Sequence, residues 1–376
     1  MIIAIDIRSA LKEKTGKGFY ALNLVKSILK ANQIFHFILY SDQDTSLFEK
    51  FENATLKVVN KRGLFWHWKV FQNLKKDKID LFWSPTSFII PFLLGQRMPY
   101  IITVHDVVAF LFPSWHNQKA VLIEKFTLKR ALKHAKKIFA VSENTKKDLI
   151  EKFGIEKEKI VLTYNSLGIK NELRKPENKK TENQILSTKY ILSVGTLEPR
   201  KNQIRLIRAF DQIKDEFFDL NLFVVGGKGW GYEKIFAEVK NRNLGNRVNF
   251  LGYIDEKSLS ELYRNAELFA FPSIYEGFGI PVLEAMSYGC PVLTSNNSSL
   301  IEVAGDAAIL INAENVDEIA EGLRRILKNE NLRKDLIKKG FEQVKKFSWE
   351  KSAKVVLNEF KSICENSESP LQKSNA

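Results

Sequence analysis

Two glutamates flank a glycine-rich turn in residues 271–291, FPSIYEGFGIPVLEAMSYGCP, the segment best suited to hold a polar ligand. Glu276 precedes the turn and Glu284 follows it, and each carboxylate can accept hydrogen bonds from the hydroxyls of an extended ligand. Glycines let a backbone approach a ligand closely, and N–H groups at a helix start favour an anion. The plainer interpretation is a strand–turn–helix with two solvated glutamates, and the glycines between them argue against it.

A basic pair follows a second apolar run, in residues 190–202, YILSVGTLEPRKN. Arg200 and Lys201 come after a turn that contains Pro199. The two cations can neutralise a diphosphate, since arginine offers a planar fork of donors and lysine a point charge. Taken alone, the pair also fits a solvated basic loop.

The first half of the chain offers a histidine and a glycine loop. His105 and Asp106 end an apolar run, where a histidine can be either structural or catalytic. Gly16 and Gly18, in residues 14–20, KTGKGFY, predict a flexible loop that can approach a phosphate. The glycines of residues 224–232, VVGGKGWGY, do not have the spacing of the dinucleotide fingerprint, and no P-loop motif is present.

These residues follow short runs rich in Ile, Val and Phe that alternate with helical patterns. Such alternation predicts buried parallel strands joined by crossover helices. The predicted strands are 2–7, 35–40, 56–59, 79–83, 100–104, 137–141 and 160–163 in the first half, and 190–194, 220–225, 248–251, 268–271, 291–294 and 308–311 in the second.

The 376 residues predict two α/β domains. We expect two Rossmann-like, doubly wound domains that face a central cleft, because ligands bind beyond the carboxyl ends of the strands in such sheets. The polar stretch 171–189 marks the boundary. The predicted parts are a first domain at 1–170, a second at 171–349, a helix at 350–364 that packs back toward the first domain, and a disordered tail at 365–376.

Charge and composition narrow the class of protein. Residues 1–170 contain 28 Lys and Arg against 15 Asp and Glu, whereas residues 171–376 contain 30 against 29. A basic first half indicates an anionic partner, which charge alone leaves open among nucleic acid, anionic lipid and a phosphorylated substrate. Cys290 and Cys364 cannot form a disulfide framework. Without a signal peptide or an apolar span in the sequence, we expect a cytoplasmic protein.

Together these segments resemble the retaining glycosyltransferases of family 4, which have the GT-B fold and include bacterial mannosyltransferases and sucrose synthase. The most specific likeness is residues 271–296, which match the family's signature of two glutamates separated by seven residues. Further similar segments occur in the family's order, namely VSENTKKDL, SVGTLEPRKN, FLGYI and SSLIEVAGDAA. The resemblance covers the chain from its first strand to about residue 349.

The resemblance implies a role for each candidate residue. Glu276 is expected near the hydroxyls of the donor sugar, Glu284 on the ribose, and Arg200 and Lys201 on the diphosphate. His105 is expected beside the reacting sugar. The remaining donor-site positions implied are Gly16 and Gly18 near the phosphates, Gly195 and Thr196 after a strand, Gly252, Tyr253 and Ile254 at the nucleobase edge, and Gly277, Phe278, Gly279 and Ile280 around the sugar and phosphate.

One position departs from the family pattern. Many members carry arginine immediately after the glycine that ends the S-V-G strand, and this chain has Thr196 there. The diphosphate would then rest on Arg200 and Lys201. The acidic Asp-x-Asp metal motif of the other major glycosyltransferase fold is absent, so the resemblance implies a metal-independent enzyme with no cofactor. The nucleotide sugar is a co-substrate, with GDP-mannose favoured over UDP-sugars.

The partners follow from the same reasoning. We expect a nucleotide-sugar donor, a glycan or lipid-linked acceptor in cell-surface polysaccharide synthesis, and no nucleic acid. A basic helix around 119–137 and the aromatic residues 66–68 suggest a peripheral location at the inner membrane face, although a solvated helix face is the blander interpretation. A basic nucleic-acid-binding protein and an inactive nucleotide-sugar binder are the competing hypotheses.

Overall fold

The computed structural model describes residues 1–12, 16–113, 118–168 and 188–368. Its described residues form two compact units, one made of 1–12, 16–113, 118–168 and 348–368 and the other of 188–347. The predicted boundary at 171–189 lies outside the described residues except for its last two, as do Lys14 and Thr15 of the predicted glycine loop and residues 369–376 of the predicted tail.

The first unit contains a parallel sheet of seven strands in the order β3-β2-β1-β4-β5-β6-β7. Its five inner strands are largely buried, as their apolar composition predicts, whereas the edge strands β3 and β7 are only partly covered. They are β1 (Ile2–Asp6), β2 (His36–Ser41), β3 (Ala54–Val58), β4 (Leu81–Ser84), β5 (Tyr100–Val104), β6 (Lys137–Ala140) and β7 (Ile160–Leu162).

The second unit contains a parallel sheet of six strands in the order β10-β9-β8-β11-β12-β13. Its strands are β8 (Lys189–Val194), β9 (Leu220–Val225), β10 (Val248–Gly252), β11 (Leu268–Phe271), β12 (Val292–Ser295) and β13 (Ala308–Ile311). All thirteen predicted strands are therefore confirmed, in order and within two residues at every end.

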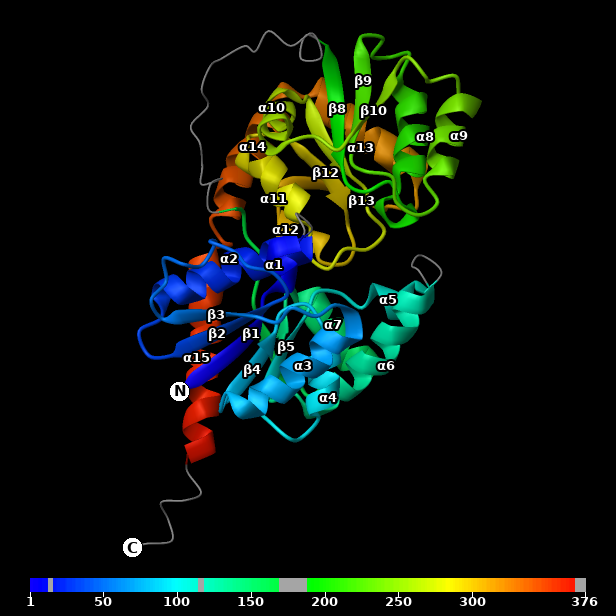
Figure 1. Ribbon diagram of the computed structural model, residues 1–376. Helices are drawn as coiled ribbons and strands as arrows, with labels where there is room; N and C mark the ends of the chain where they lie inside the picture. Colours follow the sequence, from blue (N-terminus) through cyan, green and yellow to red (C-terminus); the bar gives the residue numbers. More distant parts are fainter. Residues whose placement is uncertain (13–15, 114–117, 169–187, 369–376) are drawn as a thin grey trace, which may run out of the picture. The chain divides into compact units, whose positions relative to one another are not determined.

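Helices connect the strands on both faces of each sheet (Figure 1). In the first unit they are α1 (Arg8–Lys12), α2 (Gly16–Ala31), α3 (Gly63–Lys76), α4 (Ile89–Leu94), α5 (Val108–Leu111), α6 (Gln118–His134), α7 (Glu143–Phe153) and α15 (Trp349–Glu368). In the second they are α8 (Gln203–Ile213), α9 (Glu233–Asn241), α10 (Glu256–Asn265), α11 (Ile280–Ser287), α12 (Leu300–Ala304), α13 (Val316–Lys328) and α14 (Glu330–Val344).

The C-terminal helix α15 belongs to the first unit. It packs along α2, and the ring of its Phe360 meets those of Phe35 and Phe37 at centroid distances of 6.4 Å. The indole Nε1 of Trp349 donates a hydrogen bond of 2.6 Å to the carbonyl oxygen of Leu167. The helix continues to Glu368, beyond the predicted end at residue 364.

Both strand orders reverse direction at one point, which is the mark of a doubly wound sheet. In the first unit the reversal lies between β1 and β4, and in the second between β8 and β11. Loops that leave neighbouring strands in opposite directions open a crevice at such a point, so ligands bind there. The fold of the second unit therefore predicts a ligand site at the segments that follow β8 and β11.

Two sequence expectations about the surface are wrong. Trp66 and His67 were expected as membrane contacts, but α3 turns both inward, because Trp66 fills the core between sheet and helix and donates from Nε1 to the carbonyl oxygen of Ser41. The basic helix expected around 119–137 is α6, which ends at His134, three residues before the expected end. Trp68 remains exposed.

Candidate functional site

The segments that follow β8 and β11 meet in a cluster of charged side chains. Lys201 Nζ lies 2.6 Å from Glu276 Oε1, and Arg200 Nη1 lies 2.7 Å from Glu276 Oε2. Arg200 Nη2 also lies 2.6 Å from Glu198 Oε1. We refer to Glu198, Arg200, Lys201 and Glu276 as the Glu276 cluster. The structure thus brings together three residues that sequence analysis placed in one site, from segments about 75 positions apart.

Backbone contacts hold the two segments in register. The amide of Ile274 donates 2.9 Å to the carbonyl oxygen of Arg200, and Arg200 Nη1 donates 2.9 Å to the carbonyl oxygen of Tyr275. The buried side chain of Asn202 donates to the carbonyl oxygens of Pro272 and Ala313. The cations therefore have little freedom to leave the glutamate, which is the preorganisation that a charge-stabilising site requires.

Burial sets the electrostatics of the cluster. Glu276 is 7% exposed, and burial alone would raise its pKa, but the charges of Arg200 and Lys201 outweigh burial and hold the pKa below its ordinary value. Burial lowers the pKa of Lys201, and the Glu276 carboxylate opposes that shift. Each group therefore keeps its partner charged in a setting where an isolated charge is costly.

Two serines that the sequence analysis did not single out support the Glu276 loop. The amide of Glu276 donates 3.1 Å to Ser298 Oγ. Ser299 Oγ lies 2.9 Å from the carbonyl oxygen of Glu276 and 2.6 Å from that of Phe278. Both serines belong to the segment SSLIEVAGDAA, which resembles the family, but the resemblance implies no role for either of them.

The glycine turn leads directly into α11. Gly279 has φ +114°, a conformation that favours glycine, and an added Cβ would come within 2.7 Å of Leu300. Gly279 caps the helix and has no side chain to satisfy its first N–H groups, and Ile280 and Pro281 begin the first turn. Helix starts of this kind attract anions. The aromatic ring of Phe278 is buried against Phe347 and anchors the turn.

Glu284 lies on α11, and its carboxylate contacts Tyr263 on α10. The buried Tyr263 hydroxyl donates 3.0 Å to Glu284 Oε2. Burial raises the pKa of Glu284, and the Tyr263 hydrogen bond opposes the rise. Tyr263 was not predicted, because nothing in its local sequence distinguishes it from a core tyrosine.

A second glycine-rich loop, which does not match the dinucleotide fingerprint, lies against the loop that follows β8. Gly226 has φ +149°, and a Cβ there would fall 2.1 Å from the carbonyl oxygen of Gly195. A Cβ at Gly229 would fall 2.5 Å from Thr196 Cγ2. These glycines therefore let two strand-end loops pack backbone to backbone, and they support the exposed Thr196 without contributing a charge.

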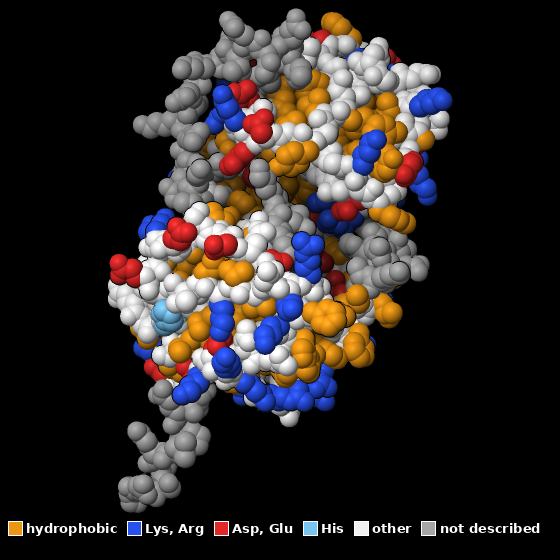
Figure 2. Space-filling view, viewed as in Figure 1, with side chains coloured by type: hydrophobic (Ala, Val, Ile, Leu, Met, Phe, Trp, Pro, Cys, Tyr) orange, Lys and Arg blue, Asp and Glu red, His pale blue; other side chains and the backbone are white. Residues whose placement is uncertain are grey.

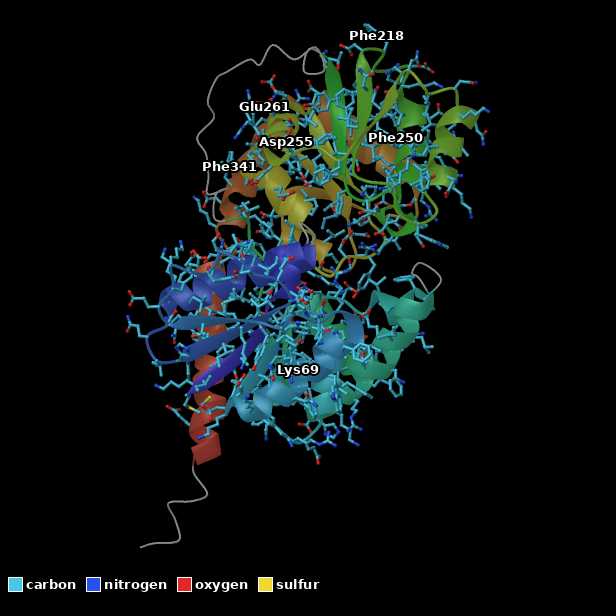
Figure 3. The ribbon with its side chains drawn as sticks, in the orientation of Figure 1. Lys69, Phe218, Phe250, Asp255, Glu261 and Phe341 are labelled. Atoms are coloured by element: carbon cyan, nitrogen blue, oxygen red, sulfur yellow. The ribbon has the colours of Figure 1, made fainter. Side chains whose placement is uncertain are left out.

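The predicted nucleobase edge follows β10. Gly252 ends the strand with φ +66°, and its carbonyl oxygen accepts 2.8 Å from the amide of Gly226. Tyr253 projects into solvent, and Ile254 is half-buried. Asp255, labelled in Figure 3 with Phe250 of β10, caps α10 through the amide of Ser258. The turn 252–254 therefore neighbours the glycine loop that packs on Gly195.

In the first unit His105 follows β5 and is buried. Its Nε2 lies 2.8 Å from the carbonyl oxygen of Pro85, which can only accept, so Nε2 carries the proton. Burial, with the nearby charge of Lys17, lowers the pKa of His105 to about 4. The imidazole is therefore neutral at physiological pH, and its Nδ1 lone pair can accept a hydrogen bond.

The glycine loop predicted at 14–20 is corrected in its described part. Gly16 is the first residue of α2, and Gly18 lies buried in the first turn of that helix. The glycines therefore begin a helix instead of forming a flexible loop. Lys17 between them is exposed and lies 3.9 Å from the Asp106 carboxylate, which follows His105. A helix start, a lysine and a neutral histidine thus share one end of the first sheet.

The fold and the Glu276 cluster define a class of protein. Two doubly wound units carry polar groups at the carboxyl ends of their strands, and the second unit presents two rigid cations beside a helix start at its reversal point. This arrangement suits a nucleotide with a diphosphate. Among the described residues, none of the helices combines the length and apolar content needed to cross a bilayer.

Comparison with known proteins identifies the family. Residues 174–343 match the family described as glycosyl transferases group 1, and residues 16–168 match glycosyltransferase family 4. The chain is 30% identical to O-antigen chain mannosyltransferase B of Escherichia coli, over 92% of this chain and 96% of that one. It is 28% identical to O-antigen chain mannosyltransferase RfbU of Salmonella typhimurium, over 84% and 88% respectively.

A solved structure has the same fold. Sucrose-phosphate synthase of Thermosynechococcus elongatus superposes with a TM-score of 0.78 over 97% of this chain and 100% of its own, at 20% identity. The chain belongs to glycosyltransferase family 4, has the GT-B fold, and is a retaining glycosyltransferase.

Proposed function

We propose that this enzyme transfers mannose from GDP-mannose to a glycan or lipid-linked acceptor during cell-surface polysaccharide synthesis. The observation that carries the proposal is the Glu276 cluster, which places two cations and a carboxylate where a doubly wound sheet binds its ligand. Two relatives that match over most of their length are O-antigen mannosyltransferases by name, which favours mannose over glucose, galactose and N-acetylglucosamine.

The chemistry follows from the charge that develops. When the bond between the anomeric carbon and the phosphate oxygen breaks, the departing nucleoside diphosphate gains negative charge and the sugar becomes oxocarbenium-like. Arg200, Lys201 and the N–H groups at the start of α11 stabilise that leaving group. Glu276 accepts hydrogen bonds from sugar hydroxyls, and Glu284 accepts them from the ribose. The acceptor oxygen bonds to the same face of the anomeric carbon, and the leaving phosphate oxygen takes its proton.

Two fixed cations also bear on cofactors. Because Arg200 and Lys201 supply the positive charge that Mg²⁺ supplies in other nucleotide-sugar enzymes, we propose that the enzyme needs neither a metal nor another cofactor. His105, neutral and hydrogen-bonded to Pro85, contributes to the transfer step as a hydrogen-bond acceptor. We further propose that the enzyme works as a peripheral protein at the inner membrane face, where a lipid-linked acceptor resides.

A ligand panel tests the donor assignment. Thermal unfolding is followed with GDP, UDP, ADP and the corresponding sugar nucleotides, because a ligand that binds the native state raises its melting temperature. GDP and GDP-mannose should give the largest shifts, and slow hydrolysis of GDP-mannose in EDTA should release α-mannose. A larger shift with UDP replaces the donor assignment, and binding without transfer or hydrolysis indicates an inactive nucleotide-sugar binder.

A further inference from the structure

Six large apolar side chains are exposed on two helices of the first unit. They are Leu64, Phe65 and Trp68 on α3, and Leu122, Ile123 and Phe126 on α6. Phe65 is 78% exposed, Leu122 71% and Phe126 68%. We call these six residues the apolar face. Single exposed apolar side chains are ordinary, whereas a contiguous group with charged margins marks an interaction surface.

The two halves of the apolar face are connected through α4, which packs against both α3 and α6. The Phe92 ring of α4 lies 5.0 Å from the Phe126 ring, centroid to centroid. Within α3, the Trp68 ring lies 5.5 Å from the Phe71 ring, centroid to centroid. Figure 2 shows apolar side chains gathered beside lysines and arginines over these helices. The surface is therefore one patch that spans three helices.

Both helices change character along their length in the same way. The exposed side of α3 passes from Leu64, Phe65 and Trp68 to Lys69, Lys75 and Lys76. The exposed side of α6 passes from Leu122, Ile123 and Phe126 to Lys129, Arg130 and Lys133. The only acidic residue in α3, α4 and α6 is Glu124, which is half-buried. Six exposed cations on α3 and α6 thus adjoin the apolar face, against one half-buried carboxylate on these helices.

The topology of the first sheet gives α3 and α6 the same direction, so their apolar parts lie side by side and so do their basic parts. Helices α3 and α6 cross over the same face of the first sheet, and both run antiparallel to its strands (Figure 1). The N-terminal halves of the two helices, which carry the apolar face, therefore lie together toward the carboxyl ends of the strands, and their basic C-terminal halves lie together toward the opposite edge. His105 follows β5 at the edge nearer the apolar face.

We propose that this surface is a docking site for an anionic lipid bilayer. The apolar face inserts among the acyl chains near the headgroups, and the cations of α3 and α6 contact lipid phosphates, the division of labour that interfacial helices use. Trp68 suits the boundary, since its ring combines apolar area with a polar N–H. Docking this way holds the strand ends that carry His105 next to the membrane. This step rests on the proposed lipid-linked acceptor.

Flotation with vesicles tests the docking surface on the full-length chain. Vesicles of phosphatidylglycerol and phosphatidylcholine are compared with vesicles of phosphatidylcholine alone. The unmodified protein should float with the anionic vesicles only, and less at high salt, because salt screens the lysines. Replacing Leu122, Ile123 and Phe126 together by serine should lower the bound fraction at least about tenfold, since burial of one large apolar side chain already has that effect on a partition equilibrium.

Matched substitutions keep the test specific. Ile34→Ser and Phe218→Ser remove side chains that are 65% and 83% exposed outside the apolar face, and these variants should bind like the unmodified protein. Lys69→Glu with Lys129→Glu should abolish the preference for anionic lipid; Lys69 is labelled in Figure 3. All these residues are exposed, so their replacement should not change the melting temperature.

Three results would overturn the docking proposal: no flotation of the unmodified protein, equal flotation of the triple serine variant, or a dimer in sedimentation that this variant dissociates. The last result would make the surface an interface between copies. Hydrolysis of the sugar nucleotide in solution should be equal in all variants. If no variant hydrolyses any sugar nucleotide, the proposed function fails whatever the vesicles show.

Discussion

Lys201 Nζ lies 2.6 Å from Glu276 Oε1. This contact joins the segments that follow β8 and β11, the two neighbouring strands between which the strand order of the second sheet reverses. The glutamate thereby occupies a position between two cations that the donor's phosphates are proposed to share. Its carboxylate compensates the buried cations when no donor is bound, and it orients them for the leaving group when the donor enters.

The first prediction concerns turnover. Replacement of Arg200, Lys201 or Glu276 by alanine should each lower kcat at least about tenfold, because each residue contributes to transition-state stabilisation. The three losses should not add, since the residues act as one network. Initial rates with saturating donor measure the effect, and near-normal rates in all three variants would remove the site assignment.

The second prediction concerns stability. Glu276→Gln leaves Lys201 without its carboxylate partner and Arg200 with Glu198 alone, which should destabilise the second unit by about 3 kcal/mol. Adding Lys201→Met should recover part of that loss while activity stays low. Urea unfolding of the single and double variants measures both values. A double variant less stable than Glu276→Gln would show that Glu276 does not stabilise the second unit by pairing with Lys201.

The third prediction uses two neighbouring glycines. Gly226→Ala forces a Cβ to within 2.1 Å of the Gly195 carbonyl oxygen, whereas Gly227→Ala meets nothing within 4 Å. Gly226→Ala should therefore displace the loop after β8 and weaken nucleoside diphosphate binding at least about tenfold, by the loss of a contact to a charged group. Gly227→Ala should bind normally. Isothermal titration compares the two, and equal affinities would contradict the packing account.

The fourth prediction concerns Tyr263 and Glu284. Tyr263→Phe removes the hydroxyl that opposes the upward shift in the pKa of Glu284, so that pKa should rise further. Ribose binding needs the carboxylate, and affinity is therefore lost as pH falls through this pKa. Titrations of nucleotide affinity against pH should show the loss beginning at higher pH in the variant. Superimposable profiles would separate Glu284 from ribose binding.

The fifth prediction concerns two buried histidines of the first unit. Burial lowers the pKa of His67 and that of His105 to about 4, against about 6.5 in an unfolded chain. The unfolded state therefore binds more protons as pH falls, so the stabilisation is complete above about pH 6.5 and is lost progressively toward pH 4. Each histidine should account for roughly 2–3 kcal/mol of that loss.

Calorimetry across this pH range measures the effect. His105→Gln should flatten the dependence, and His36→Gln, which alters an exposed histidine, should leave it unchanged. A melting temperature that does not fall from neutral pH to pH 5 in the unmodified protein would show that neither histidine is held neutral by the fold.

The elements and most of the candidate donor site could be predicted from the sequence. Parallel strands are short and uniformly apolar, so runs such as 220–225 and 268–271 coincide with strands. The reversal point places residues after β8 and β11 together, which is why Arg200, Lys201 and Glu276 meet. Their mutual pairing was not predicted, because sequence shows which charges share a site but not whether they neutralise one another.

Other features depend on tertiary structure. Gly16 and Gly18 suggested a loop by composition, yet the chain continues into α2 there, since packing against α15 outweighs the low helix propensity of glycine. Trp66 suggested a membrane contact by residue type, yet its position on the helix turns it into the core. The sequence does not predict that Leu122 and Phe126 are exposed, because their exposure depends on which side of α6 packs against the sheet.

The most direct test of the central claim compares the binding of GDP and guanosine by calorimetric titration, in the unmodified enzyme and in Arg200→Ala and Lys201→Ala. The account predicts that the unmodified enzyme binds GDP much more tightly than guanosine, and that each substitution removes most of that difference while guanosine affinity stays unchanged. Equal GDP affinity in all three proteins would contradict it, because the Glu276 cluster would then not hold the diphosphate.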